Sequence, residues 1–201
     1  MLVIPPRGGG ITYRKEVFLY KELSDMTLVE LWELFPITLS EHKDCWEEWF
    51  VEEKNFLQTL LNNKAEIFHI GSTAVKNIKA KPIVDIIITA DKNNFEFIKN
   101  TLINNGYICM AEANNRISFN KGYTKFGYAT RVFHIHLRKP QDDKEIYFCK
   151  YLQENPKIAK EYEALKMELW KKYPKDRDGY TEAKGSFINE HTKKAIKLYK
   201  K

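Results

Sequence analysis

Apolar residues in the first sixty positions recur at helical spacing. In "TLVELWELFP" (27–36) they lie three or four apart, as on one face of a helix, and Thr27 and Glu30 have the spacing of a capping box. The proline ends this helix. A longer helix is expected from about Ser40 to Leu61. Its inner side carries Trp46, Trp49, Phe50, Leu57, Leu60 and Leu61.

The middle of the chain has the short alternating or continuous apolar runs that are typical of strands. The segments with this pattern are 66–75, 82–90, 107–111, 116–120 and 129–138. A helix at 93–106, closed by Gly106, interrupts them, and the turn-rich "KGYTKFGY" (121–128) separates the last two. The sequence therefore predicts a small sheet with one crossover helix.

The last third of the chain returns to helical spacing. Helices are expected over 143–155, from Pro156 onward, and over 178–200. The fold class is thus α/β (α+β), a small mixed sheet with flanking helices on one side and a helical C-terminal third. We expect an N-terminal extension with one helix (1–39), which begins with a Pro- and Gly-rich flexible segment, and a single domain at 40–201.

Composition narrows the function classes. Among 201 residues, Lys and Arg exceed Asp and Glu by 33 to 27, a modest excess that suits a nucleotide. Nucleic acid ranks lower, because no long basic tract occurs. No membrane span or signal-like segment is evident, and the odd, scattered Cys45, Cys109 and Cys149 are typical of reduced thiols, so we expect a cytoplasmic protein.

Two motifs in the first half indicate a site for an anion and a cation. In "HIGSTAV" (69–75), the turn Gly71-Ser72-Thr73 offers backbone amides and small hydroxyls that can cradle phosphate. Asp85 interrupts the apolar run of "PIVDIII". A buried carboxylate needs a partner, which is either an internal donor such as a lysine or a metal ion.

Histidines form a second cluster. His134 and His136 lie two apart on one strand and so on one face, where they can ligate a metal, transfer protons, or simply hydrogen-bond in a polar patch. We favour His136 as base or auxiliary ligand. His69 either orients the Gly-Ser turn or joins the metal cluster. Such imidazole ligands would shift the metal preference from Mg²⁺ toward Mn²⁺ or Zn²⁺.

Basic and aromatic residues supply candidates for nucleotide binding. Tyr162 with Lys166, and Tyr180 with Lys184, are each four apart on a helix. Each phenol could contact a base while the ammonium binds phosphate, or the lysine could simply cover an apolar ring. The further candidates for phosphate contact are Lys81 and Arg116.

Several separated motifs resemble the GrpB family, bacterial proteins with a nucleotidyltransferase-like fold. They are "HIGSTAV…AKPIVDI", "RISFNKGYTKFGYATRVFHIHLR" with its His-x-His segment, "YFCKYLQENPKIAKEYEALKMELWKKY" and "DGYTEAKGSFI". The resemblance runs from about Trp46 to Ile188. "LVELWELFPITLSEH" resembles an N-terminal extension found in some members.

The resemblance implies a polymerase-β-like catalytic scaffold, in which a Gly-Ser turn holds the triphosphate and a D-x-D or D-x-E strand binds two magnesium ions. Gly71 and Ser72 match the first element, and Asp85 matches the first carboxylate of the second. Ile87 stands where the second carboxylate would be, so the chain departs from the two-metal pattern.

Three functions fit these observations. The first is a nucleotidyltransferase-like enzyme that moves a nucleotidyl or phosphoryl group from a nucleoside triphosphate to a small acceptor. The second is a non-catalytic nucleotide-binding module, which Ile87 favours. The third is a metal-dependent phosphohydrolase that uses Asp85 with His134 and His136. The apolar face of the first helix fits docking within the chain or a homodimer.

Overall fold

The computed structural model describes residues 21–113 and 115–200, so the predicted flexible start lies outside the described part. The strands are β1 (Glu66–Ile70), β2 (Val84–Thr89), β3 (Ile108–Ala113), β4 (Arg116–Thr124) and β5 (Gly127–Arg138). The α-helices are α1 (Leu28–Leu34), α2 (Cys45–Leu60), α3 (Phe95–Asn104), α4 (Lys144–Glu154), α5 (Pro156–Lys172), α6 (Arg177–Glu182) and α7 (Gly185–Tyr199). Short 3₁₀ turns are η1 (Leu23–Asp25), η2 (Ser72–Ala74) and η3 (Lys92–Asn94).

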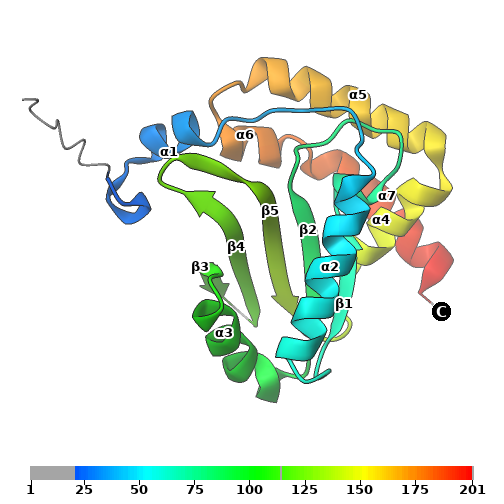
Figure 1. The fold of residues 1–201 in the computed structure, drawn as a ribbon. Helices are drawn as coiled ribbons and strands as arrows, with labels where there is room; N and C mark the ends of the chain where they lie inside the picture. Colours follow the sequence, from blue (N-terminus) through cyan, green and yellow to red (C-terminus); the bar gives the residue numbers. More distant parts are fainter. Residues whose placement is uncertain (1–20, 114, 201) are drawn as a thin grey trace, which may run out of the picture.

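The strands form one mixed sheet in the order β1-β2-β5-β4-β3 (Figure 1). Adjacent strands are antiparallel except for β2 and β5, which pair in parallel and place Asp85 opposite His134. Because side chains alternate across a strand, this register puts the two residues on the same face of the sheet. The parallel pair therefore joins the two motifs that the sequence singled out.

One face of the sheet is closed by an apolar core under α2 and α3 (Figure 1). The α2 residues Trp46 and Leu57 are fully buried there, as predicted. They pack with alternate residues of the central strands, such as Ile86 on β2 and Ile135 on β5. Burial of side chains of this size contributes about 2 kcal/mol each, which makes this side the main core.

The opposite face is covered by the C-terminal helices. Ile87 of β2 packs there with Phe148 and Leu152 of α4 and with Tyr162 of α5. The sheet thus has helices on both faces, whereas the sequence predicted them on one side. The prediction was wrong because β1 and β2 carry apolar residues on both faces, and each apolar face must be covered.

The helices follow the predicted positions with two corrections. The capping box forms, with Thr27 N donating to Glu30 Oε2 at 2.8 Å and Glu30 N donating to Thr27 Oγ1 at 3.3 Å. Helix α2 begins at Cys45 rather than Ser40, because Ser40 makes a backbone bridge with Ala80. The last predicted helix is two helices, α6 and α7.

The strands differ most from prediction at the β4–β5 hairpin. "KGYTKFGY" is not a long turn: β4 continues to Thr124 and β5 begins at Gly127, with Tyr123 opposite Tyr128. The first strand ends at Ile70 and is followed by the 3₁₀ turn η2, as predicted for a strand that ends in a turn. No helix in the described residues is long and apolar enough to cross a membrane.

Candidate functional site

A cavity of about 760 Å³ lies between the open part of the second sheet face and the helices α1, α4, α5 and α6. Its size is that of a small-molecule site. The predicted site residues that line it are Gly71, Ser72, Thr73, Lys81, Asp85, His134, His136, Tyr162, Lys166, Tyr180 and Lys184. Two predicted residues, His69 and Arg116, do not line it.

The Gly71 turn passes directly beside Asp85. Gly71 has φ +73°, and a Cβ built on it would lie 2.4 Å from Asp85 Oδ2. Only glycine fits both the left-handed backbone and the close approach. Ser72 then presents its hydroxyl to the cavity, where it accepts a hydrogen bond from Lys166 Nζ at 3.0 Å.

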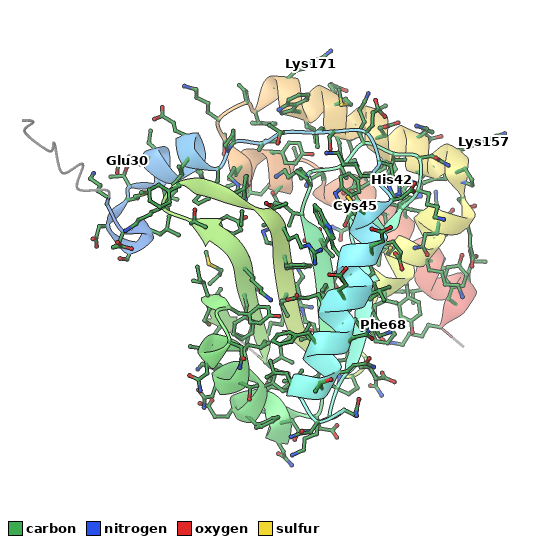
Figure 2. The ribbon with its side chains drawn as sticks, in the orientation of Figure 1. Glu30, His42, Cys45, Phe68, Lys157 and Lys171 are labelled. Atoms are coloured by element: carbon green, nitrogen blue, oxygen red, sulfur yellow. The ribbon has the colours of Figure 1, made fainter. Side chains whose placement is uncertain are left out.

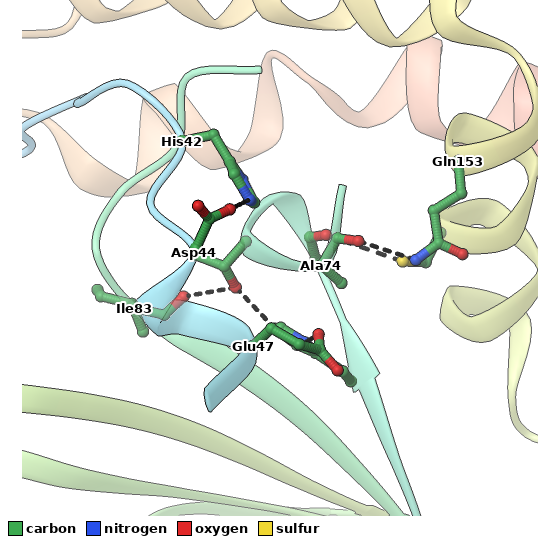
Figure 3. Close-up of polar contacts among 10 residues, drawn as sticks. His42, Asp44, Glu47, Ala74, Ile83 and Gln153 are labelled. Carbon is green, nitrogen blue, oxygen red and sulfur yellow. Dashed lines mark hydrogen bonds and ion pairs between the residues drawn. The ribbon is translucent and has the colours of Figure 1, made fainter. Parts of the chain in front are cut away.

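Hydrogen bonds to neighbouring segments hold this turn in place. Gln153 of α4 donates to the Ala74 carbonyl at 2.8 Å (Figure 3). Thr73 is 2% exposed and donates to the Ile83 carbonyl at 3.2 Å, so its hydroxyl supports the turn more than it faces the cavity. His69 Nε2 lies 3.1 Å from the same hydroxyl.

His69 lies where it can orient the turn, which is the first of its two predicted roles. Its Nδ1 lies 3.2 Å from Glu47 Oε2, and its ring stacks on Phe50 with centroids 4.6 Å apart. Burial lowers the pKa of His69, against the opposing effect of Glu47. With both nitrogens occupied and the ring outside the cavity, His69 is not placed beside Asp85 as a metal ligand.

Asp85 meets the two β5 histidines. Its Oδ1 lies 3.2 Å from His134 Nδ1 and 3.9 Å from His136 Nε2. Burial opposes ionisation, but the hydrogen bonds and charge of these histidines outweigh it, so the pKa of the Asp85 carboxyl lies below its ordinary value. The carboxylate is 29% exposed and its partners are imidazoles, not the internal lysine that was the alternative.

His134 is engaged at both ring nitrogens. Beyond its contact with Asp85, its Nε2 lies 2.8 Å from Tyr123 Oη, and Tyr123 in turn accepts a hydrogen bond from Arg177 at 3.2 Å. His136 is less constrained, with Arg138 Nη2 3.5 Å from its Nδ1. His134 is therefore a fixed partner of the carboxylate, and His136 is the histidine with more freedom to act.

Three lysines give the cavity its positive charge. Burial first, with nearby cations second, lowers the pKa of Lys81 and of Lys166 to about 7. Burial lowers the pKa of Lys184 to about 8. Arg177 adds a fourth cation to the same lining. A bound anion would raise the depressed pKa of such a lysine, because the anion stabilises the charged ammonium form.

The two tyrosines of the helical pairs are covered on their faces. Tyr180 is 1% exposed and lies beneath both Lys184 Nζ at 4.2 Å and Lys81 Nζ at 4.6 Å. Tyr162 stacks on Phe187 with centroids 5.4 Å apart and has Lys166 Nζ 5.0 Å from its ring. These rings position the lysines, as in the simpler of the two interpretations, and leave no open face for a nucleobase.

Arg116 lies away from the cavity. Its guanidinium pairs with Asp142, with Nε 2.7 Å from Asp142 Oδ2, and the pair is partly exposed. On β4 its neighbour Ile117 lies opposite Leu137, whereas the site lies around His134, toward the other end of the hairpin. The phosphate role expected for Arg116 therefore finds no support in its position.

The residues present do not form a multi-ligand metal centre. Within 21–113 and 115–200, no group of three or more His, Cys, Asp or Glu side chains is placed to hold an ion. Ile87 is fully buried in the apolar cluster under α4, so it leaves the two-metal arrangement without its second carboxylate. Asp85 fits the simpler case of one Mg²⁺ shared between a carboxylate and phosphates, with water completing the shell.

The sequence did not single out several residues that complete the cavity. Tyr123 lies in the segment taken for a turn, and Arg177 lies at the start of a short helix without periodic apolar residues. Leu28 and Trp32 of α1 also line the cavity. The apolar face of the helix at 27–36 was the available signal in the sequence. It predicted docking within the chain or a homodimer, but not a position beside the cavity.

Comparisons with known proteins agree on the family and the fold. The family model described as "GrpB protein" matches residues 36–194. The glutamate-rich protein GrpB of Alkalihalophilus pseudofirmus is 34% identical over 162 residues, which cover 77% of this chain and 92% of that protein. The crystal structure of GrpB from Enterococcus faecalis has a TM-score of 0.71 at 30% identity, covering 82% of this chain and all of that one.

A more distant likeness extends to the nucleotidyltransferases. A structure of the Cid1 poly(U) polymerase with Mg 3′-dATP bound matches at a TM-score of 0.50 and 12% identity, over 78% of this chain and 51% of that one. At this identity the likeness concerns the fold alone. It agrees with the nucleotidyltransferase-like scaffold predicted from the sequence.

Proposed function

The chain belongs to the GrpB family and has a nucleotidyltransferase-like fold, and we propose that its cavity binds a nucleoside triphosphate for transfer of a nucleotidyl or phosphoryl group to a small acceptor. The observation that carries this proposal is that Ser72, Asp85 and three lysines from distant parts of the chain line one cavity. Free cysteines at all three positions fit a cytoplasmic protein.

The triphosphate would lie along the Gly71–Ser72 turn. Lys166 bridges this turn to α5, since it donates both to Ser72 Oγ and to the Lys79 carbonyl, and the residue is 2% exposed. Lys81 and Lys184, which both lie over the Tyr180 ring, line the same cavity. Because the four cations outnumber the two carboxylates of the lining, Asp85 and Asp178, the cavity complements a ligand with several negative charges.

For nucleotidyl transfer, an acceptor hydroxyl attacks the α-phosphorus. A new P–O bond forms, the bridging P–O bond to the β-phosphate breaks, and pyrophosphate leaves with that electron pair. The hydroxyl proton passes to His136, which is less constrained than His134. The lysines offset the charge on the leaving group.

Asp85 together with the phosphate oxygens would hold a divalent metal. Mg²⁺ suits one carboxylate plus phosphates, whereas Mn²⁺ or Zn²⁺ would suit the adjacent imidazoles. When bound, the ion supplies charge neutralisation at the phosphates. Asp85 has the depressed pKa that keeps it ionised for this role.

A second candidate is a nucleotide-binding module without turnover. Ile87 favours it, because this fully buried residue replaces the carboxylate that would hold a second metal ion. The two candidates share the same cavity and the same ligand. They differ only in whether a product forms.

The test measures binding and turnover separately. Calorimetry with each of the four nucleoside triphosphates compares the wild type with Lys166→Ala, and with Lys171→Ala as a matched control. Lys171 is on the same helix, and Figure 2 shows it pointing away from the sheet. We expect Lys166→Ala to weaken binding about tenfold or more and Lys171→Ala to leave it unchanged.

Turnover is followed with α-labelled and γ-labelled triphosphates, a small-molecule cell extract and Mg²⁺, Mn²⁺ or Zn²⁺. Label in a new product supports the transferase, and binding without product supports the module. Phosphate release without an acceptor supports the phosphohydrolase that uses Asp85 with the two histidines. Absence of binding by all four triphosphates would overturn the proposal.

A further inference from the structure

The cavity also has an apolar wall. Leu28 and Trp32 of α1 form part of it, and Ile108 and Met110 of β3 face the same space. These side chains are far from buried, since Leu28 is 62%, Met110 56% and Ile108 41% exposed. Large apolar side chains gathered in a concave site indicate a ligand more strongly than scattered ones do.

Helix α1 is fixed in place, although none of its seven residues is buried. Phe35, directly after it, is 2% exposed and packs on Tyr123 and Tyr128 of the β4–β5 hairpin, with ring centroids 4.6 and 5.0 Å apart. Figure 1 shows α1 beside this hairpin. The anchor holds the apolar side of α1 toward the cavity without burying it.

The α1 part of the wall lies outside the region that matches the family model, whereas Ile108 and Met110 lie inside it. The matched region begins at residue 36, whereas α1 ends at Leu34. The tyrosines of the helical pairs are already covered by lysines and by Phe187, so they offer no apolar surface of their own. The apolar wall formed by α1 and β3 therefore adds to the apolar surface of Ile83, Phe148 and Leu152, which also line the cavity.

We propose that the acceptor is an amphipathic small molecule, whose apolar chain or ring lies between α1 and β3 while its polar end faces Asp85 and the lysines. The inference rests on the proposed function and narrows its acceptor. A volume of about 760 Å³ suits a small molecule. Asp85 and the lysines would bind an anionic or nucleophilic end of the acceptor, and Leu28 and Met110 would contact its apolar chain or ring.

The probes are alkyl phosphates with two, six and ten carbons, measured by calorimetry on the full chain. They combine an anionic end with an apolar tail of graded length. We expect affinity to rise with each added methylene, by up to about fourfold per step where the tail is buried. The gain should be reduced in Leu28→Ser and in Met110→Ser.

Val29→Ser is the matched control. Val29 is on the same helix and is 62% exposed, equal to Leu28, but it does not line the cavity. It should leave the chain-length gain unchanged. Because both α1 positions are exposed, neither variant removes buried packing, and thermal unfolding checks that all three variants remain folded.

Four outcomes decide the proposal. A chain-length gain lost in Leu28→Ser but kept in Val29→Ser supports it. Equal affinity for all chain lengths, alongside normal binding of ATP, overturns it and leaves the proposed function standing. Weaker ATP binding in Leu28→Ser with unchanged tripolyphosphate binding overturns it in favour of a base site. A change of sedimentation in Leu28→Ser overturns it in favour of contact between copies.

Failure of the proposed function has a different pattern. In that case ATP and tripolyphosphate would not bind, while hexanol, which carries no phosphate, would still bind the apolar wall. The two proposals therefore fail in separate measurements.

Discussion

Two acidic residues lie in the interior on opposite sides of the sheet, and their surroundings differ. Glu53 of α2 is 8% exposed and accepts hydrogen bonds from Tyr107 and from Lys121, the latter at 2.8 Å. Lys121 Nζ also lies 4.6 Å from the Tyr107 ring centroid, so protein side chains surround the Glu53 carboxylate. Asp85 also has two partners, His134 and His136, but it opens into the cavity.

The difference shows that hydrogen-bond partners alone do not distinguish a structural carboxylate from a functional one. Both carboxylates are paired, as buried acids must be. Around Glu53 one cation meets one anion, whereas around Asp85 the cations exceed the anions and a space remains for a ligand. An acid with an open volume and surplus positive charge is the better candidate for chemistry.

The largest expected effect comes from removing charge at the two acids in turn. Asp85→Asn should lower the rate of metal-dependent nucleotidyl or phosphoryl transfer by about 100- to 1,000-fold, since the carboxylate that would hold the ion is lost. Glu53→Gln should leave transfer unchanged within about twofold. Labelled-product assays measure both. Equal losses in the two variants would contradict the distinction between them.

Gly71→Ala tests the contact that brings the turn to Asp85. A Cβ would meet Asp85 Oδ2 at 2.4 Å and would also strain the backbone, so we expect the free energy of unfolding to fall by about 3 kcal/mol. Gly106→Ala is the control, because Gly106 has φ +83° but nothing within 4 Å of the added Cβ. It should cost about 1 kcal/mol, as measured by urea unfolding.

Glu53→Ala tests whether the closed network is structural. It leaves Lys121 and Tyr107 without their acceptor, and we expect a loss of about 2 kcal/mol in the free energy of unfolding. Triphosphate affinity at a temperature where the variant is folded should not change. A normal stability together with lost affinity would assign Glu53 to the site instead.

The lysines predict opposite pH trends for binding and stability. Between pH 7 and 9, Lys81, Lys166 and Lys184 lose their protons in the folded protein, so triphosphate affinity should fall by about tenfold. The unfolded chain keeps these protons up to its ordinary lysine pKa, so the lysines make the free protein more stable as the pH rises in this window. Calorimetry and unfolding across the range test both signs.

The smallest effect is expected at Arg116. Its pair with Asp142 is partly exposed, and Arg116→Ala should change the free energy of unfolding by less than about 1 kcal/mol. Triphosphate affinity should stay the same, in contrast to the loss expected for Lys166→Ala. A matching loss in Arg116→Ala would contradict the placement of the site.

Periodicity in the sequence located most elements, but not their neighbours. The capping box and the buried tryptophan of α2 follow from local spacing, which one segment alone determines. The long hairpin was missed because Gly122 and Lys125 resemble turn residues, although Tyr123 and Tyr128 pair across it. Which strand lies beside β2 depends on packing between distant segments, and no local pattern records it.

The candidate site shows the same division. The Gly-Ser turn, Asp85 and the helical lysines were found because each combines a chemical type with a position on an element. The position of Arg116 away from the cavity could not be known without the strand register. Tyr123 and Arg177 were missed because their contact with His134 exists only after the hairpin and α6 come together.

The parallel pairing of β2 with β5 also has a consequence for folding. Strands β3, β4 and β5 follow one another with only two residues between neighbours. Strand β2 pairs with β5 only when the long segment between them, which contains α3, β3 and β4, closes as a loop. Local hairpins form faster than pairs that need long loop closure. We therefore expect the meander to form before the chain can recognise any ligand, with Asp85 and His134 joined in the late, slow step of refolding.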